Sequence, residues 1–171
     1  MVVRSVVRRS RLKELGVGGA TFRAAGETVP VGATVQIPSD KSIKASVTFE
    51  NTGSGTVSGD FFVNIYYADT LSDSSGDPKS DNSTWSSEAT TNDLILETLT
   101  LNPGDSVTRD GASPVDASWW SEGTKIDAGL VLGVFIGGTT YYLDSLKIAD
   151  AVEIIAPTRR VEITGVTFSE A

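Results

Sequence analysis

The chain has 171 residues, a formal net charge of −8, and neither cysteine nor histidine. Its length suits a single domain that buries a substantial hydrophobic core. The missing residue types exclude disulfides and thiolate metal sites, and they remove the commonest zinc ligand, the commonest general base and the usual partner of a serine nucleophile. No run approaches the roughly 20 apolar residues of a membrane-spanning helix.

Positive charge is concentrated at the start of the chain. The first 15 residues hold one acid, Glu14, and five basic residues: Arg4, Arg8, Arg9, Arg11 and Lys13. Their net charge is +4, so the other 156 residues carry −12. Apolar residues at three- and four-residue spacing predict a short helix or an ordered arm. We expect this basic arm to contact nucleic acid or an acidic neighbouring subunit, the alternative being a solvated, frayed terminus.

From Leu15 onward the apolar residues alternate with polar ones, which is typical of β-strands. The clearest early example is Ile43–Phe49, which ends in the turn-forming run Asn51–Gly55. A second strand is predicted at Phe61–Ala68, with aromatic residues on both faces, and this indicates a central strand. The polar segment Asp69–Asn92 predicts a long, mobile surface loop. Four aspartates recur in it at four-residue spacing, a pattern that could suit calcium but is not an EF-hand: Asp69, Asp73, Asp77 and Asp81.

The second half of the chain continues with short strands separated by turn residues. Strands are predicted at Leu94–Leu101, Ser106–Arg109, Leu130–Ile136, Thr139–Ile148, Ala151–Ile155 and Val161–Phe168. Asn102–Asp105 predicts a turn, and Gly137-Gly138 predicts a tight hairpin between two of these strands. Eight or nine short strands with at most one helix favour an all-β fold, an immunoglobulin-like antiparallel β-sandwich. We assign residues 1–14 to the basic arm, 15–156 to the sandwich and 157–171 to a C-terminal strand extension.

Two turn motifs resemble a known family. Val47–Gly55 reads VTFENTGSG and precedes the aromatic strand, and Leu101–Val107 reads LNPGDSV. These motifs are similar to those of the CARDB family of immunoglobulin-like adhesion and cell-surface modules, over roughly Ala20–Ile148. The resemblance implies a non-enzymatic sandwich. The sequence departs from the family at its end, where it lacks the acidic, asparagine-rich closing segment typical of these modules.

Aromatic and acidic side chains supply the remaining candidate sites. Trp119, Trp120, Tyr141 and Tyr142 could form a platform for a sugar or a partner, although adjacent residues of a strand point to opposite faces. We therefore expect one tryptophan in the core and the other at a ligand or partner contact. The carboxylate pairs Glu88/Asp93 and Glu97/Asp105 have no feature that fixes their separation, as glycosidase chemistry requires. The sequence predicts no enzyme, no cofactor and no metal site.

The first and last predicted strands share one pattern. Leu15–Phe22 reads LGVGGATF and Val161–Phe168 reads VEITGVTF, so a glycine, a threonine and a phenylalanine coincide. Such segments could occupy similar places at a sheet edge, which permits exchange between subunits. The alternatives are that the last segment pairs within its own domain or is the remnant of a tandem repeat.

The basic arm, the C-terminal strand extension and the sandwich between them together predict a structural assembly protein. We expect a capsid, decoration or tail component of a virion, or a filament subunit, that binds itself or other structural subunits and is made in the cytoplasm. The alternative is a surface adhesion or carbohydrate-binding module at the cell surface. The expected subunit-interface residues are Arg4, Arg8, Arg9, Arg11, Val161, Ile163, Val166 and Phe168.

Overall fold

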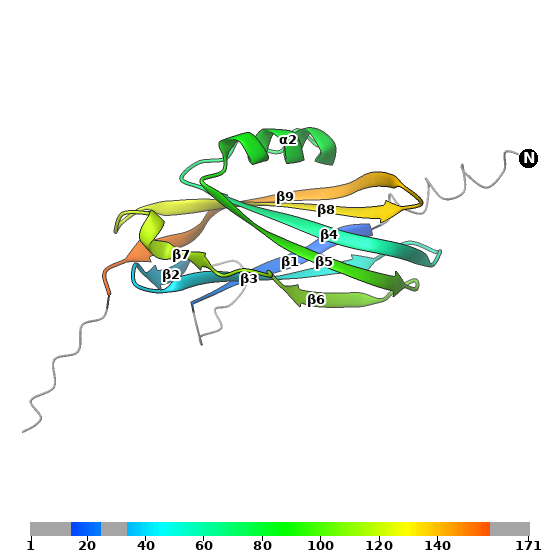
Figure 1. The fold of residues 1–171 in the computed structure, drawn as a ribbon, viewed down its shortest axis with the longest axis horizontal. Helices are drawn as coiled ribbons and strands as arrows, with labels where there is room; N and C mark the ends of the chain where they lie inside the picture. Colours follow the sequence, from blue (N-terminus) through cyan, green and yellow to red (C-terminus); the bar gives the residue numbers. More distant parts are fainter. Residues whose placement is uncertain (1–14, 25–33, 158–171) are drawn as a thin grey trace, which may run out of the picture.

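The computed structural model describes residues 15–24 and 34–157, which form a sandwich of two β-sheets (Figure 1). The strands in these residues are β1 (Leu15–Ala24), β2 (Val35–Pro38), β3 (Ser42–Asn51), β4 (Val57–Ala68), β5 (Thr91–Leu101), β6 (Ser106–Asp110), β7 (Val115–Asp116), β8 (Lys125–Ile136) and β9 (Thr139–Ile155). The described helices are α2 (Pro78–Glu88) and the 3₁₀ turn η1 (Ala117–Trp119). No helix in this part of the chain is long and apolar enough to cross a membrane.

The two sheets differ in size. In sheet one, β3 pairs with β1 on one side and with β6 and β7 on the other. Sheet two has the order β2-β9-β8-β4-β5. The predicted all-β sandwich is confirmed. One pair departs from the expected antiparallel pattern, because β2 runs parallel to β9. The long segment between these two strands permits the crossover connection that a parallel pair needs.

The space between the sheets is filled by the alternate apolar residues of the central strands. In β3 these residues are Ile43, Ala45, Val47 and Phe49, and in β4 they are Phe61, Val63, Ile65 and Tyr67. Phe49 stacks on Phe61 across the two sheets, with ring centroids 6.0 Å apart. Because β4 lies between β8 and β5, its predicted central position is confirmed.

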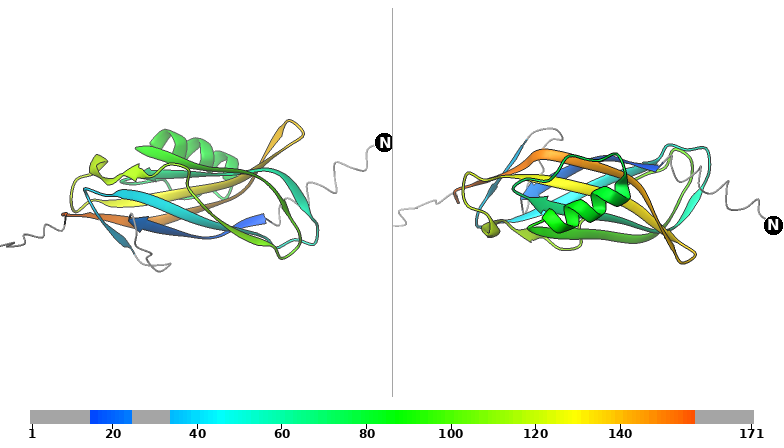
Figure 2. Two further views of the ribbon diagram at one scale, coloured as in Figure 1. Left: turned by 60° about the horizontal axis from the view of Figure 1, so that its bottom comes forward. Right: turned by 90° about the horizontal axis from the view of Figure 1, so that it is seen from above.

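The loop predicted over Asp69–Asn92 is wrong, because this segment contains α2. The Asp77 side chain caps the helix by accepting a hydrogen bond from the backbone N–H of Lys79, and Pro78 occupies the first turn. Figure 2 shows α2 lying across the outer face of sheet two. There Trp85 is buried in a second apolar cluster with Tyr66, Ala68, Leu71 and Val131. Trp85 is the helix's one large apolar side chain, so the sequence has no helical period to detect.

The predicted hairpin at Gly137-Gly138 is confirmed as the turn between β8 and β9. Both glycines have positive φ angles, 56° and 82°, as a two-residue hairpin turn of the primed type requires. The strand after the turn is longer than predicted. It runs on through Ala151–Ile155, which the sequence predicts as a separate strand.

The turn after β3 is held by one buried side chain. Asn51 is fully buried, and its amide nitrogen donates to the carbonyl oxygens of Gly55 and Leu101, at 2.8 and 3.0 Å. Its side-chain oxygen accepts from the backbone N–H of Gly53 at 3.0 Å. Asn51 therefore joins the end of β3 in sheet one to the end of β5 in sheet two.

Candidate functional site

β1 forms one edge of sheet one, where its hydrogen-bonded neighbour among the described strands is β3. Leu15 pairs with Asn51 at one end, and Ala24 pairs with Ile43 at the other. The register shifts between Val17 and Gly19, which marks a β-bulge. An edge strand presents one row of backbone N–H and C=O groups that can pair with another chain. This edge is the first candidate site.

The strand that receives β1 is a core strand. Along β3, the residues opposite Phe22, Ala20 and Val17 are Ala45, Val47 and Phe49, and these three β3 side chains are at most 1% exposed. A strand at the β1 position therefore completes the cover of sheet one's core face. Any replacement strand must place apolar residues at the same register positions.

The eight residues predicted to form the subunit interface lie outside the described residues. They are Arg4, Arg8, Arg9, Arg11, Val161, Ile163, Val166 and Phe168. The structure shows the sheet edge formed by the matching segment Leu15–Phe22, and it confirms that this segment is a strand.

As predicted, one of the two adjacent tryptophans is buried and the other is not: Trp120 is 6% and Trp119 56% exposed. Their ring centroids lie 6.4 Å apart. The platform of four aromatic residues is wrong. Tyr142 pairs with Gly133 near the hairpin. Gly123, three residues after Trp120, instead donates its backbone N–H to the carbonyl oxygen of Ile154, near the far end of β9. About ten strand residues, roughly 33 Å at 3.3 Å per residue, separate these two positions.

The carboxylates considered for catalysis each have a local partner. Glu97 forms an ion pair with Arg109 of β6 and so joins the edges of the two sheets. Glu88 accepts hydrogen bonds from Ser72, at the start of the α2 connection. The buried Asp93 accepts from the backbone N–H of Ser113 at 3.0 Å, and Asp105 accepts from that of Asn102 at 2.7 Å. These groups hold strands and turns in place.

Three of the four aspartates considered for calcium are engaged elsewhere. Asp77 caps α2, and Asp73 lies 3.1 Å from the ammonium of Lys147. Asp81 accepts from Ser74, Ser75 and Ser145. Within residues 15–24 and 34–157, no group of three or more acidic side chains is arranged to hold a metal ion.

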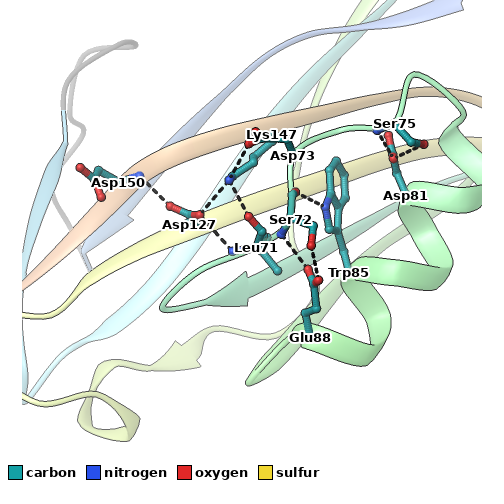
Figure 3. A network of polar contacts seen from close by, with 10 residues as sticks. All are labelled: Leu71, Ser72, Asp73, Ser75, Asp81, Trp85, Glu88, Asp127, Lys147 and Asp150. Carbon is teal, nitrogen blue, oxygen red and sulfur yellow. Dashed lines mark hydrogen bonds and ion pairs between the residues drawn. The ribbon is translucent and has the colours of Figure 1, made fainter.

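A polar network under α2, shown in Figure 3, was not expected from the sequence. Lys147 of β9 donates to the Leu71 carbonyl oxygen at 2.5 Å and lies 3.2 Å from Asp127 of β8. Asp127 also accepts from the backbone N–H groups of Leu71 and Asp150, both at 3.0 Å. The network holds the connection between β4 and α2 against sheet two.

Asp81 provides a test of how α2 is attached. Burial by itself raises the pKa of this carboxyl, but hydrogen bonds from Ser145, Ser74 and Ser75 outweigh it and hold the pKa below its ordinary value. We expect Asp81→Asn to lower the free energy of unfolding by about 1–3 kcal/mol at neutral pH. The side-chain NH₂ group of the new asparagine would face the serine hydroxyl and backbone N–H groups that now donate to the carboxylate.

The pH dependence follows from the lowered pKa. The stabilisation from Asp81 is complete above the unfolded-state pKa, near 4, and is lost as the pH falls through the lower folded-state value. The difference between wild type and Asp81→Asn should therefore shrink on acidification, as measured by urea unfolding at pH 7 and pH 3. The exposed Asp69→Asn is the control, and an equal effect of both substitutions would contradict the role of Asp81.

The opposite edge of the sandwich has two exposed leucines. Leu94 and Leu96 of the edge strand β5 are 40% and 65% exposed on its outer face. The Leu94 carbonyl oxygen accepts a hydrogen bond from the backbone N–H of Ala112, so a loop covers this edge in part. The sequence signal was the apolar run Leu94-Ile95-Leu96, which places apolar side chains on both faces.

Comparisons with known proteins support the fold. No protein-family model matches the sequence, and no curated protein matches it. The crystal structure of the C-terminal domain of wzt is similar at 8% identity and a TM-score of 0.51, covering 92% of this chain and 84% of that one. The crystal structure of Bacteroides uniformis β-glucuronidase is similar over 78% of this chain, at 11% identity and a TM-score of 0.44. The match covers only 14% of the enzyme's own length. The protein therefore shares a β-sandwich fold with the wzt domain.

Proposed function

We propose that this protein is a non-enzymatic assembly protein whose subunits join through their terminal segments, in a virion or a filament. The observation that carries the proposal is the edge position of β1, together with the recurrence of its sequence pattern at residues 161–168. A second segment of the same pattern suits the same kind of edge. The partners would be further copies of the chain or other structural subunits.

Two further observations support this reading. The carboxylates that could have served in hydrolysis are used in loop, strand and turn contacts, and the chain has no histidine or cysteine. The turn held by Asn51 supports an immunoglobulin-like sandwich of the kind that the CARDB resemblance implies. The fold alone does not assign a function, which depends on the surfaces and sites that the sandwich carries.

Light scattering tests the proposal. One chain has a mass of 18.0 kDa, and we expect the mass of the full-length protein in solution to rise above this value with concentration. Deleting residues 158–171 should restore the monomer mass and leave the thermal unfolding midpoint within a few degrees. A full-length chain that stays monomeric at all concentrations contradicts the proposal.

One observation favours a second function. Trp119 is more than half exposed beside a buried neighbour, as in sites that bind a sugar face or a protein partner. A surface adhesion or carbohydrate-binding module would use this side chain. A monomeric protein that binds a specific sugar on a glycan array, and loses that binding in Trp119→Ala, would favour this function over assembly.

A further inference from the structure

We infer that residues 161–168 of one copy replace β1 of a neighbouring copy and pair with β3 in the register that β1 itself uses. This inference rests on the proposed assembly function and specifies its contact. It follows from the β1–β3 register, from the residue types of the two segments, and from the distance between the end of β9 and the start of β1.

The register and the shared pattern agree position by position. If Val161 takes the place of Leu15, the shared glycine, Gly165, takes the place of Gly19, which follows the register shift in β1. Glycine in a strand often marks a bulge. The apolar residues Ile163, Val166 and Phe168 then stand opposite the buried Phe49, Val47 and Ala45. The second segment therefore meets the requirement for apolar residues opposite the core face of β3.

The second segment is also the better strand former. β1 contains three glycines within four residues, Gly16, Gly18 and Gly19, whereas residues 161–168 contain one. Glycine loses more conformational freedom than other residues when it is fixed in a strand, and threonine, isoleucine and valine are enriched in strands. Exchange therefore replaces a weak edge strand with a stronger one.

A chain cannot place its own segment at this position. Val161 would have to lie opposite Asn51, which bonds to the end of sheet two where β4 starts at Val57. β4 runs from there to Ala68, roughly 36 Å at 3.3 Å per residue, and β9 ends near Ala68. Figure 1 likewise shows β1 beginning and β9 ending at opposite ends of the sandwich. Six residues from Ile155 to Val161 span at most about 21 Å. The segment must therefore come from another copy.

The contact that results is head-to-tail. Each copy gives residues 161–168 to the next and receives the same segment from the one before, so the two surfaces in contact are different. A heterologous contact of this kind generates a ring or a filament. The displaced β1 is then released from the sheet edge.

The register also makes one unfavourable contact. It places Glu162 opposite Glu50, where β1 has Gly16. Like charges directly opposite each other weaken a strand pair. We expect Glu162→Gln to tighten association about two- to five-fold in sedimentation at neutral pH, and an unchanged or weakened association would overturn the register.

Engineered disulfides test replacement directly, because the natural chain has no cysteine. The double variant Gly16→Cys, Glu50→Cys joins β1 to β3 at a directly opposed pair, which lies within disulfide reach. After oxidation it should remain monomeric under conditions in which wild type assembles, and reduction should restore assembly. If the oxidised variant assembles as wild type does, strand replacement is wrong while the proposed assembly function stands.

A second pair reports the register between copies. Mixing a Glu50→Cys copy with a Glu162→Cys copy should give a covalent dimer on a non-reducing gel, and one chain with both substitutions should give a ladder. The control partner for Glu50→Cys is Ile163→Cys, which is shifted by one residue and so faces the other side of the sheet. Equal cross-linking of both partners, or none, would overturn the register. A wild-type protein that never assembles contradicts the proposed function as well. Failure of the strand-exchange register and failure of the assembly function are therefore distinguishable.

Discussion

Replacing Trp85 with alanine is expected to lower the free energy of unfolding by about 3–5 kcal/mol. Trp85 is fully buried between α2 and sheet two, and its ring NH donates to the carbonyl oxygen of Ser72 at 2.8 Å. Its ring lies so close to Gly129 of β8 that a β-carbon there would come within 2.7 Å of it. Truncation leaves a large cavity in a cluster of few residues, and it removes the helix's one apolar contact.

Chemical denaturation followed by circular dichroism measures this loss. Trp119→Ala is the matched control, because it deletes the same side chain from a position that is 56% exposed, and it should cost less than about 1 kcal/mol. If the two substitutions cost the same, α2 does not depend on Trp85 for its attachment to the sheet.

Replacing Lys147 with methionine is expected to lower the free energy of unfolding by about 3–5 kcal/mol, because it leaves a buried carboxylate without its cation. The side chains of Lys147 and Asp127 are 16% and 8% exposed. Burial alone raises the pKa of Asp127, but hydrogen bonds from the backbone N–H groups of Leu71 and Asp150 and the ammonium of Lys147 hold it below its ordinary value.

The sign of the pH dependence follows from this lowered pKa. The stabilisation from Asp127 is present above the unfolded-state pKa, near 4, and disappears as the pH falls through the folded-state value. The loss in Lys147→Met, measured by urea unfolding, should therefore be largest at neutral pH and smaller at pH 3. Lys41→Met is the control, since Lys41 and Asp40 form an ion pair with both side chains about half exposed, and it should cost at most about 0.5 kcal/mol. A constant loss across pH would contradict the role assigned to the Lys147–Asp127 pair.

The parts of the fold that were predictable are those whose signals are local. Alternation in Ile43–Phe49 and the Gly137-Gly138 turn are read within a few residues, and both predictions are confirmed. α2 was missed because one tryptophan and an aspartate cap hold it on the sheet, without a repeating apolar face. The Lys147 network joins residues from the α2 connection, β8 and β9, so no stretch of sequence displays it.

The candidate site was predictable only in part. The strand at Leu15–Phe22 follows from its alternation, but its place at the edge of sheet one depends on pairing with β3, across the intervening segment. The basic arm and the last predicted strand lie outside the described residues, so their predicted contacts stay predictions. The even spacing of Asp69, Asp73, Asp77 and Asp81 suggested one shared ligand. The structure instead gives Asp73, Asp77 and Asp81 a lysine, a helix N-terminus and three serines.

The parallel pairing of β2 with β9 joins segments that lie far apart in the sequence. Gln36 donates to Glu153, 117 positions further along the chain, and contacts over such separations are slow to form. β1 and β3 are much closer in sequence, so a newly made chain can pair its own β1 before residues 161–168 have left the ribosome. Under the proposed exchange, each new subunit would first cover its β3 edge with its own β1, and the rate of assembly would depend on how fast the glycine-rich β1 detaches.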